Sequence, residues 1–371
     1  MPQGGHRSRP GGRLMPIPPG FGFSVTPGSP IGVGEEMAEA EALGYDRLGI
    51  WDSPALFREP WVTLASVARD TSRIRLGTWV TNPISRHPLV TAAAAATLED
   101  LAPGRTYVGI GAGGTGVWHL GARESTLDGL REYIVAMRDL WDRGHAQFAG
   151  AEARMEWGRG VRVPIIVSAH GPRSLRLAGE IADGVVVGLG VTPDVVRGSL
   201  AHIAEGAERA GRSLDDIDVW FTCFWFVDPE PGAAMAEGGW AATAFALHFA
   251  RGRTEGKFVP PEYLAGIEAL GADYDLVAHG RVDEDLKWRY VERADELGIG
   301  DYIRRRFMFC GTPNEVEAQI REAMAAGARN FDGAIDADLP EHRIRITKWA
   351  RNVLSRFRGT DGAATTQGGH G

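Results

Sequence analysis

Two polar segments of this sequence have the residue types of an active site. The first begins with Asp52 and Ser53, which directly follow the apolar run 47–51. If that run is a buried parallel strand, its carboxyl end points the acid into the mouth where such folds carry their chemistry. The alternative is structural, because Asp commonly caps a turn or helix and Pro54 would fix the turn. Position alone leaves both interpretations open.

The second segment contains a histidine and reads Ala169-His170-Gly171-Pro172-Arg173-Ser174. Pro172 suits the first position of a helix, and Gly171 permits an unusual backbone angle. The free N–H groups of the first turn, helped by the helix dipole and Arg173, would bind an anion such as phosphate. A plain turn into a helix is the alternative. His170 has three open roles: general acid, ring-stacking group or loop residue.

Two further segments suit a flat ring that lies against the backbone. One reads Leu76-Gly77-Thr78-Trp79-Val80-Thr81-Asn82-Pro83, for which the alternative is a core Trp and an ordinary Asn-Pro turn. The other, 109–114, formally matches the dinucleotide pattern GxGxxG. That pattern requires a helix to begin at once, whereas 115–121 is a poor helix start. We therefore expect these glycines to give a ring or its tail close access to the backbone.

The elements that must position these residues form a regular βα rhythm. Expected strands are 21–25, 47–51, 74–80, 106–111, 163–169, 184–189, 217–227 and 330–335. Expected helices are 34–43, 60–70, 90–101, 125–143, 173–182, 193–210, 314–326 and 341–357. Eight such repeats predict a single (β/α)8 TIM barrel, an α/β fold, over residues 19–358. Tails 1–18 and 359–371 are Gly-rich, and we expect them to be disordered.

The connection between the seventh and eighth strands is too long for a loop and predicts a helical insertion over 228–305. It is rich in aromatic residues and also contains histidine and arginine. One interpretation is that these side chains pack the helices together. The other is a lid that covers the mouth and selects the substrate. The residues concerned are Trp225, Phe226, Trp240, Phe245, His248, Phe249, Tyr274, His279, Arg281 and Trp288.

Composition narrows the class of protein. The chain has 40 basic and 48 acidic residues, a net charge of −8, so a general nucleic-acid partner is not expected. The run 304–306 (Arg-Arg-Arg) is interpreted as a solvated helix end. Cys223 and Cys310 are too far apart in sequence to suggest a metal motif or a disulfide. With neither a transmembrane run nor a secretory signal in the sequence, we expect a cytoplasmic protein with a small-molecule substrate and no membrane partner.

Taken together, several segments resemble the luciferase-like flavin- and F420-dependent oxidoreductases, and most of all the branch of methylenetetrahydromethanopterin reductase. The match runs from about residue 20 to 357 and is weakest over 228–305. Beside the segments above, it is carried by 44–52, 86–98, 104–111, 178–184 and 311–313. The resemblance implies F420 as cofactor, with FMN as the alternative, and its ring at the barrel mouth. It also implies a homodimer and a separate reductase that supplies reduced cofactor.

The resemblance assigns roles residue by residue. The strand-two acid that approaches the deazaflavin falls on Asp52, and a non-proline cis peptide falls on Trp79–Val80. A polar position near the ring falls on Asn82. The contacts after strand four fall on Gly111, Ala112 and Gly113. The phosphate cradle after strand five falls on Ala169, His170, Gly171, Arg173 and Ser174.

Two departures bear on the chemistry. Many F420 enzymes have His after the strand-two acid, where this chain has Ser53. The glucose-6-phosphate dehydrogenase branch has Glu just past the strand-four glycines, where this chain has Gly114, which puts sugar-phosphate oxidation in doubt. The leading hypothesis is hydride transfer between F420 and a C=C, C=N or C=O group, in which His170 or Ser53 assists proton transfer. The alternatives are an FMN-dependent monooxygenase and a non-catalytic barrel that only binds such a ligand.

Overall fold

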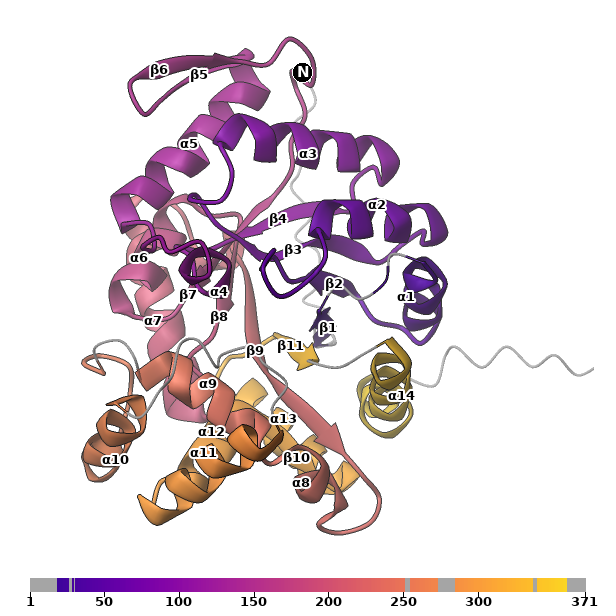
Figure 1. The fold of residues 1–371 in the computed structure, drawn as a ribbon, viewed down its shortest axis with the longest axis vertical. Coiled ribbons are helices and arrows are strands. Elements are labelled where there is room, and N and C mark those ends of the chain that lie inside the picture. The colour runs from indigo at the N-terminus through magenta and orange to yellow at the C-terminus, as the bar shows by residue number, and fades with distance from the viewer. Residues whose placement is uncertain are drawn as a thin grey trace, which may run out of the picture.

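In the computed structural model, eight strands form a closed barrel in which neighbouring strands run parallel (Figure 1). The structure describes residues 19–26, 29, 31–250, 254–272, 284–335 and 339–358. Around the barrel the order is β1 (Gly20–Val25), β2 (Arg47–Ile50), β3 (Arg75–Thr81), β4 (Thr106–Ile110), β7 (Ile165–Ala169), β8 (Gly184–Val187), β9 (Asp218–Val227) and β11 (Asn330–Ile335). β11 pairs with β1 and closes the ring. The predicted TIM barrel is confirmed.

Helices surround the barrel, and five of them begin with a proline. These are α2 (Pro60–Asp70), α3 (Pro88–Leu101), α6 (Pro172–Ile181), α7 (Pro193–Arg209) and α13 (Pro313–Ala325). Proline suits this position because the first N–H of a helix has no partner within the helix. The other helices of the ring are α1 (Val33–Ala42), α4 (Thr115–Trp118), α5 (Leu127–Arg143), α14 (Leu339–Trp349) and α15 (Ser355–Phe357).

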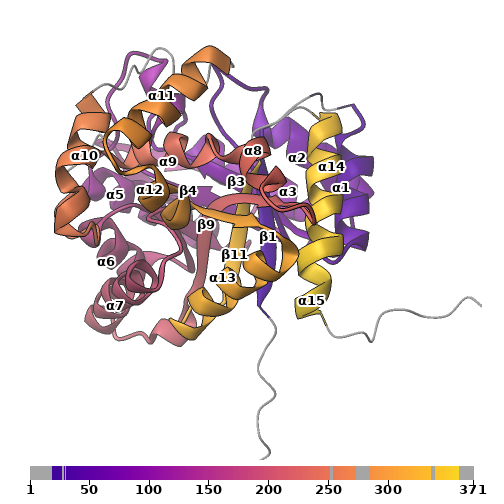
Figure 2. The same ribbon diagram turned by 90° about the horizontal axis from the view of Figure 1, so that it is seen from below.

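The insertion between the seventh and eighth barrel strands is helical, as predicted. It contains α8 (Ala233–Gly238), α9 (Ala241–Ala250), α10 (Pro261–Ala272), α11 (Glu284–Glu296) and α12 (Gly300–Phe307), which gather on one side of the barrel (Figures 1 and 2). The side chains of Phe245 and His248, together with Tyr274, His279 and Arg281, lie outside the described residues, as do both predicted tails.

Three of the strands were not predicted. A short antiparallel hairpin of β5 (His145–Phe148) and β6 (Ala151–Arg154) projects beyond α5 (Figure 1). β10 (Met308–Gly311) pairs with the end of β9, outside the closed ring. Four-residue strands carry too little hydrophobic pattern to be recognised in a sequence.

The run of three arginines was misinterpreted as a solvated helix end. Arg305 is exposed, but Arg306, in the last turn of α12, has a fully buried side chain. Its guanidinium donates hydrogen bonds to the carbonyl oxygens of Leu189, Phe258 and Lys257. The prediction was wrong because these acceptors come from distant segments, and their position depends on the fold.

Inside the barrel, a buried arginine lies beneath the mouth. The Arg47 guanidinium carbon is 3.5 Å from the ring centre of Trp220 and 4.3 Å from that of Trp79. Burial lowers the pKa of Arg47 to about 10. Gly49 leaves room for Trp79, because a Cβ at Gly49 would be 2.5 Å from the Cβ of Trp79. The interior packing thus holds the Trp79 indole from below.

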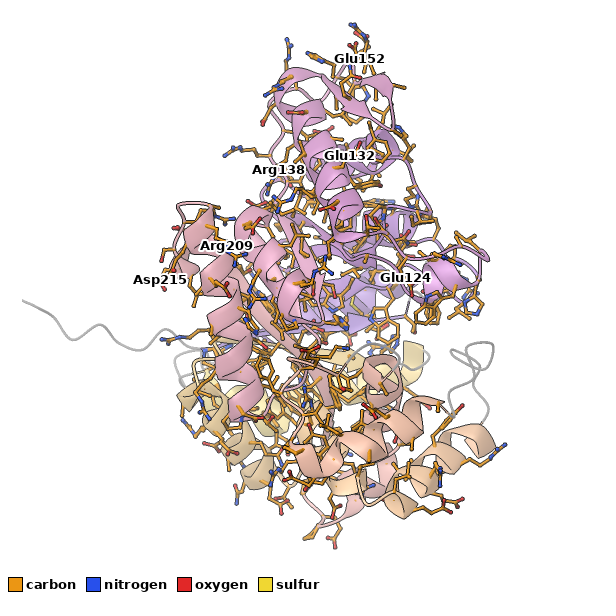
Figure 3. The ribbon with its side chains drawn as sticks, turned by 90° about the vertical axis from the view of Figure 1, so that its left-hand side faces the viewer. Glu124, Glu132, Arg138, Glu152, Arg209 and Asp215 are labelled. Carbon is orange, nitrogen blue, oxygen red and sulfur yellow. The ribbon has the colours of Figure 1, made fainter. Side chains whose placement is uncertain are left out.

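Helix α6, which follows β7, is held by close contact with α7. A Cβ on Gly179 of α6 would be 2.1 Å from the carbonyl oxygen of Ile203, and one on Gly206 of α7 would be 2.0 Å from that of Arg176. At the rim of this contact, Glu180 pairs with Arg131 of α5 and Arg209 of α7. Arg138 and Arg209 are on the face seen in Figure 3. The two glycines therefore set the distance of α6 from its neighbour.

We predict that Gly206→Ala lowers the free energy of unfolding by about 2 kcal/mol or more, because the new methyl group meets backbone that cannot move alone. Chemical denaturation followed by circular dichroism measures the loss. Gly129→Ala is the matched control, since its methyl group would meet side-chain hydroxyl groups, Ser125 Oγ at 2.7 Å and Thr126 Oγ1 at 3.3 Å, and no backbone. Equal stability of the two variants would contradict the close helix packing.

Candidate active site at the barrel mouth

Asp52 is a buried acid that does not cap anything. Its side chain is 5% exposed, and neither carboxylate oxygen has a hydrogen-bond partner. The Nε atom of Arg86 is 3.7 Å from Oδ2. Burial raises the pKa of Asp52 from its ordinary value of 3.8, and the Thr81 side chain and Arg86 nearby only partly oppose that rise. The capping interpretation is wrong, because Glu59 caps the following helix. A buried carboxylate that accepts no hydrogen bond from the protein is expected where a polar ligand binds.

Ser53 and Asn82 lie next to Asp52 under a single helical turn. The Ser53 hydroxyl hydrogen-bonds to the hydroxyl of Thr115 in α4. A Cβ on Gly116 would be 2.7 Å from the Asp52 carbonyl oxygen and 3.5 Å from Nδ2 of Asn82. Asn82 Oδ1 accepts hydrogen bonds from the two backbone N–H groups that form the turn after β3. The ends of β2, β3 and β4 are thus joined by side chains.

The peptide bond between Trp79 and Val80 is cis, as the resemblance implied. The glycines of β4 lie against this bond and make room for it. A Cβ on Gly109 would be 2.1 Å from the Thr78 carbonyl oxygen, and one on Gly111 would be 3.2 Å from Cγ2 of Val80. Their pattern matched GxGxxG, but α4 is only one turn long, too short for a dinucleotide site.

His170 lies at the end of β7 with its ring turned across the mouth. Its Nε2 is 3.1 Å from the Ser168 hydroxyl. A Cβ on Gly188 would be 2.6 Å from the imidazole, so the ring fits only against glycine. Burial and the Lys257 ammonium lower the pKa of His170 to about 4. The imidazole is therefore neutral near pH 7, where it can exchange a hydrogen bond but holds no positive charge.

Helix α6 begins directly after His170. Gly171 is extended, with φ −178°, so the unusual angle that glycine permits is not used and the helix start does not require glycine. No side chain caps this end of the helix. Ser174 Oγ accepts from the His170 backbone N–H and donates to the Gly171 carbonyl oxygen, while Arg173 is exposed. The N–H groups of Arg173 and Ser174, in the first helical turn, have no acceptor within the helix.

The predicted residues form a continuous row along the rim. Asp52, Ser53 and Asn82 lie at one end, and Val80 contacts Gly111. A Cβ on Gly111 would be 3.4 Å from the Cβ of Ser168. Ser168 in turn hydrogen-bonds to His170, and the row continues from there to the start of α6. Ala112 and Gly113, between β4 and α4, are partly exposed, and Ala169 is buried. Sequence reasoning missed Arg86, Thr115 and Lys257, which no strand-end pattern marks.

Among the described residues, no group of three or more His, Cys, Asp or Glu side chains could hold a metal ion. Over the same ranges, no helix is long and apolar enough to cross a bilayer. Cys223 and Cys310 are both free.

We predict that Asp52→Asn does not lower the free energy of unfolding at pH 7. Because the folded-state pKa of Asp52 is raised, the stabilisation present at low pH is lost as the pH rises above about 3.8. The amide of the variant cannot ionise and avoids this loss. The stability of the variant relative to the wild type therefore increases as the pH rises. Denaturation curves at several pH values measure the difference. A large destabilisation at pH 7, absent in acid, would contradict the unpaired state of this carboxylate.

Comparisons with known proteins agree with this geometry. The family model described as luciferase-like monooxygenase matches residues 20–330. The F420-dependent glucose-6-phosphate dehydrogenase of Nakamurella multipartita is 31% identical, covering 93% of this chain and 98% of the relative. The 5,10-methylenetetrahydromethanopterin reductase of Methanolobus tindarius is 27% identical, covering 83% and 91%.

Solved structures show the same fold. The coenzyme F420-dependent tetrahydromethanopterin reductase from Methanopyrus kandleri has a TM-score of 0.73 at 24% identity, covering 92% of this chain and 100% of that one. An F420-dependent secondary alcohol dehydrogenase has a TM-score of 0.67 at 21% identity, covering 91% and 99%. The extent of the family match shows that this chain belongs to the luciferase-like monooxygenase family.

Proposed function

We propose that this protein is an F420-dependent oxidoreductase that transfers a hydride between deazaflavin F420 and a small organic substrate. The observation that carries the proposal is the row of polar groups along the rim, from the buried carboxylate of Asp52 to the N–H groups at the start of α6. These groups suit a ligand with a polar ring at one end and an anionic tail at the other. The relatives that are named F420-dependent support the choice of cofactor.

The residues present fit that cofactor. The bound cofactor supplies hydride chemistry at a ring carbon. Asp52 would accept a hydrogen bond from the ring, since its carboxylate oxygens have no partner in the described chain. Trp79 and Val80 would form the wall against the ring and the substrate. The N–H groups at the start of α6, with Ala169 through Ser174, would hold the anionic tail.

In this proposal, uncharged side chains at the mouth transfer the proton. His170 with its lowered pKa would donate or accept a proton as a neutral imidazole, hydrogen-bonded to Ser168. Ser53, paired with Thr115, is the other hydroxyl group at the mouth. Because Ser53 and Gly114 replace His and Glu of related branches, the substrate class stays at C=C, C=N or C=O reduction, or the reverse.

The second candidate is an FMN-dependent monooxygenase, which the name of the matching family favours. We predict that the purified protein binds F420 with a dissociation constant at least tenfold below that for FMN. Fluorescence titration with each cofactor measures the two constants. Oxygen uptake with reduced FMN and a substrate panel is the control, and we expect none. Tight binding of FMN alone, or oxygen consumption coupled to substrate loss, would overturn the proposal.

We further propose that the protein acts as a homodimer in the cytoplasm and receives reduced cofactor from a separate reductase. The family resemblance supports these assignments. Light scattering measures the mass in solution, and we predict twice the 40.0 kDa chain. A monomer that retains full cofactor affinity would contradict the dimer and leave the oxidoreductase proposal standing.

A further inference from the structure

A loop of the insertion crosses the start of α6. We call residues 254–259, which precede α10, the strap. A Cβ on Gly256 of the strap would be 2.6 Å from Cγ of Pro172. Cε of Lys257 is 3.9 Å from the position of a Cβ on Gly171. The strap therefore touches both residues that open the helix, although about 85 residues separate them in sequence.

Arg306 fixes the backbone of the strap. Its guanidinium donates to the Lys257 carbonyl oxygen at 2.6 Å and to the Phe258 carbonyl oxygen at 3.0 Å. The same group donates to the Leu189 carbonyl oxygen, 2.8 Å away after β8. A fully buried guanidinium thus joins the barrel rim to the strap. Such charge-assisted bonds are stronger than bonds between neutral groups.

Phe258 is a second residue that holds the strap in place, and it does so with a strained backbone. Its φ is +61°, a left-handed value that bulky residues rarely adopt. The ring lies on α7, stacked on His202 with ring centres 5.8 Å apart. A Cβ on Gly198 would be 2.2 Å from this ring, so residue 198 has to be glycine. Strain of this kind persists where surrounding contacts enforce it and often marks a functional segment.

The strap brings a lysine whose charge has no acidic partner. The Nζ atom of Lys257 donates to the Phe249 carbonyl oxygen at 3.1 Å and lies 4.8 Å from the Phe249 ring centre. Burial and, to a smaller extent, the nearby Arg306 lower the pKa of Lys257 to about 8. Within the described ranges, no carboxylate lies within 4 Å of Lys257 or Arg306.

The other groups around Lys257 do not balance this charge. His170 is neutral, and its pKa is itself lowered by Lys257. Asp194 of α7 and Tyr302 of α12 act on Arg306, and the Tyr302 hydroxyl accepts a hydrogen bond from it. Two cations lie side by side next to a helix N-terminus, Arg306 fully buried and Lys257 half-buried, and they cost free energy that an anion would offset.

We propose that Lys257 is a binding residue for the anionic tail of the cofactor, carried to the start of α6 by the strap. This inference rests on the proposed function and extends it. The insertion then contributes directly to cofactor binding, beyond any covering of the mouth. The tail lies between the N–H groups of α6 on one side and the Lys257 ammonium on the other.

The test is the affinity of the full-length protein for F420, measured by fluorescence titration for the wild type, Lys257→Met and Lys257→Arg. Loss of a charge-assisted contact predicts about tenfold weaker binding or more in Lys257→Met, with Lys257→Arg close to wild type. Arg143→Met, on an exposed side chain, controls for net charge and should bind normally. An unchanged F420 affinity in Lys257→Met would overturn the inference.

The pH profile separates a charge contact from a structural role. With a pKa of about 8, Lys257 loses its proton in mildly alkaline solution, so wild-type affinity should fall above about pH 8. Lys257→Arg keeps its charge and should lack this fall. The same alkaline fall in both proteins would overturn the role of Lys257. Failure of the wild type to bind F420 would instead overturn the proposed function.

A second variant acts on the strap from a distance. Gly198→Ala displaces the Phe258 ring and, through it, Lys257, without altering any residue proposed to touch the ligand. We expect weaker F420 binding in a protein with a native circular dichroism spectrum. Normal affinity in this folded variant would overturn the role of the strap.

Discussion

Closure of eight parallel strands is the constraint on which the rest of the structure depends. Because parallel strands end together, closure brings residues from β2, β3, β4 and β7 to one rim. Side chains and backbone from neighbouring strands approach so closely at this rim that some positions accept only glycine. Gly111 admits Val80, and Gly188 admits the His170 ring. The glycine pattern of β4 thus reflects contact between strands at least as much as contact with a ligand.

Buried charge indicates where a ligand belongs. Asp52 is a carboxylate with no hydrogen-bond partner, and Lys257 is an ammonium group with no acid within 4 Å in the described chain. Each costs free energy in the ligand-free protein. They lie at opposite ends of the row of polar groups, as a ligand with a polar ring and an anionic tail requires.

The elements that depend on local sequence patterns could be predicted from the sequence. The apolar strands and the helices that begin with proline stood close to their predicted positions, and β11 was predicted residue for residue. Asp52, Asn82 and His170 could be named because each follows a strand, and strand ends converge in a barrel. The cis peptide at Trp79–Val80 came from family resemblance and from no local pattern.

The sequence could not reveal contacts between distant segments. Arg306 looked like one of three solvated arginines, yet its acceptors lie up to 117 residues away. Lys257 gave no signal, because it lies in a loop of the insertion where the family resemblance is weakest. For both residues tertiary packing decided the outcome. Gly171 permits an unusual backbone angle but is extended, the conformation that is favoured before a proline.

The most direct test of the central claim is the absorbance spectrum of the cofactor that co-purifies with this protein from a host that makes both F420 and FMN. The account predicts a deazaflavin spectrum that disappears when the protein is denatured and the small molecules are removed. A flavin spectrum in its place would contradict the assignment of F420 and favour the monooxygenase.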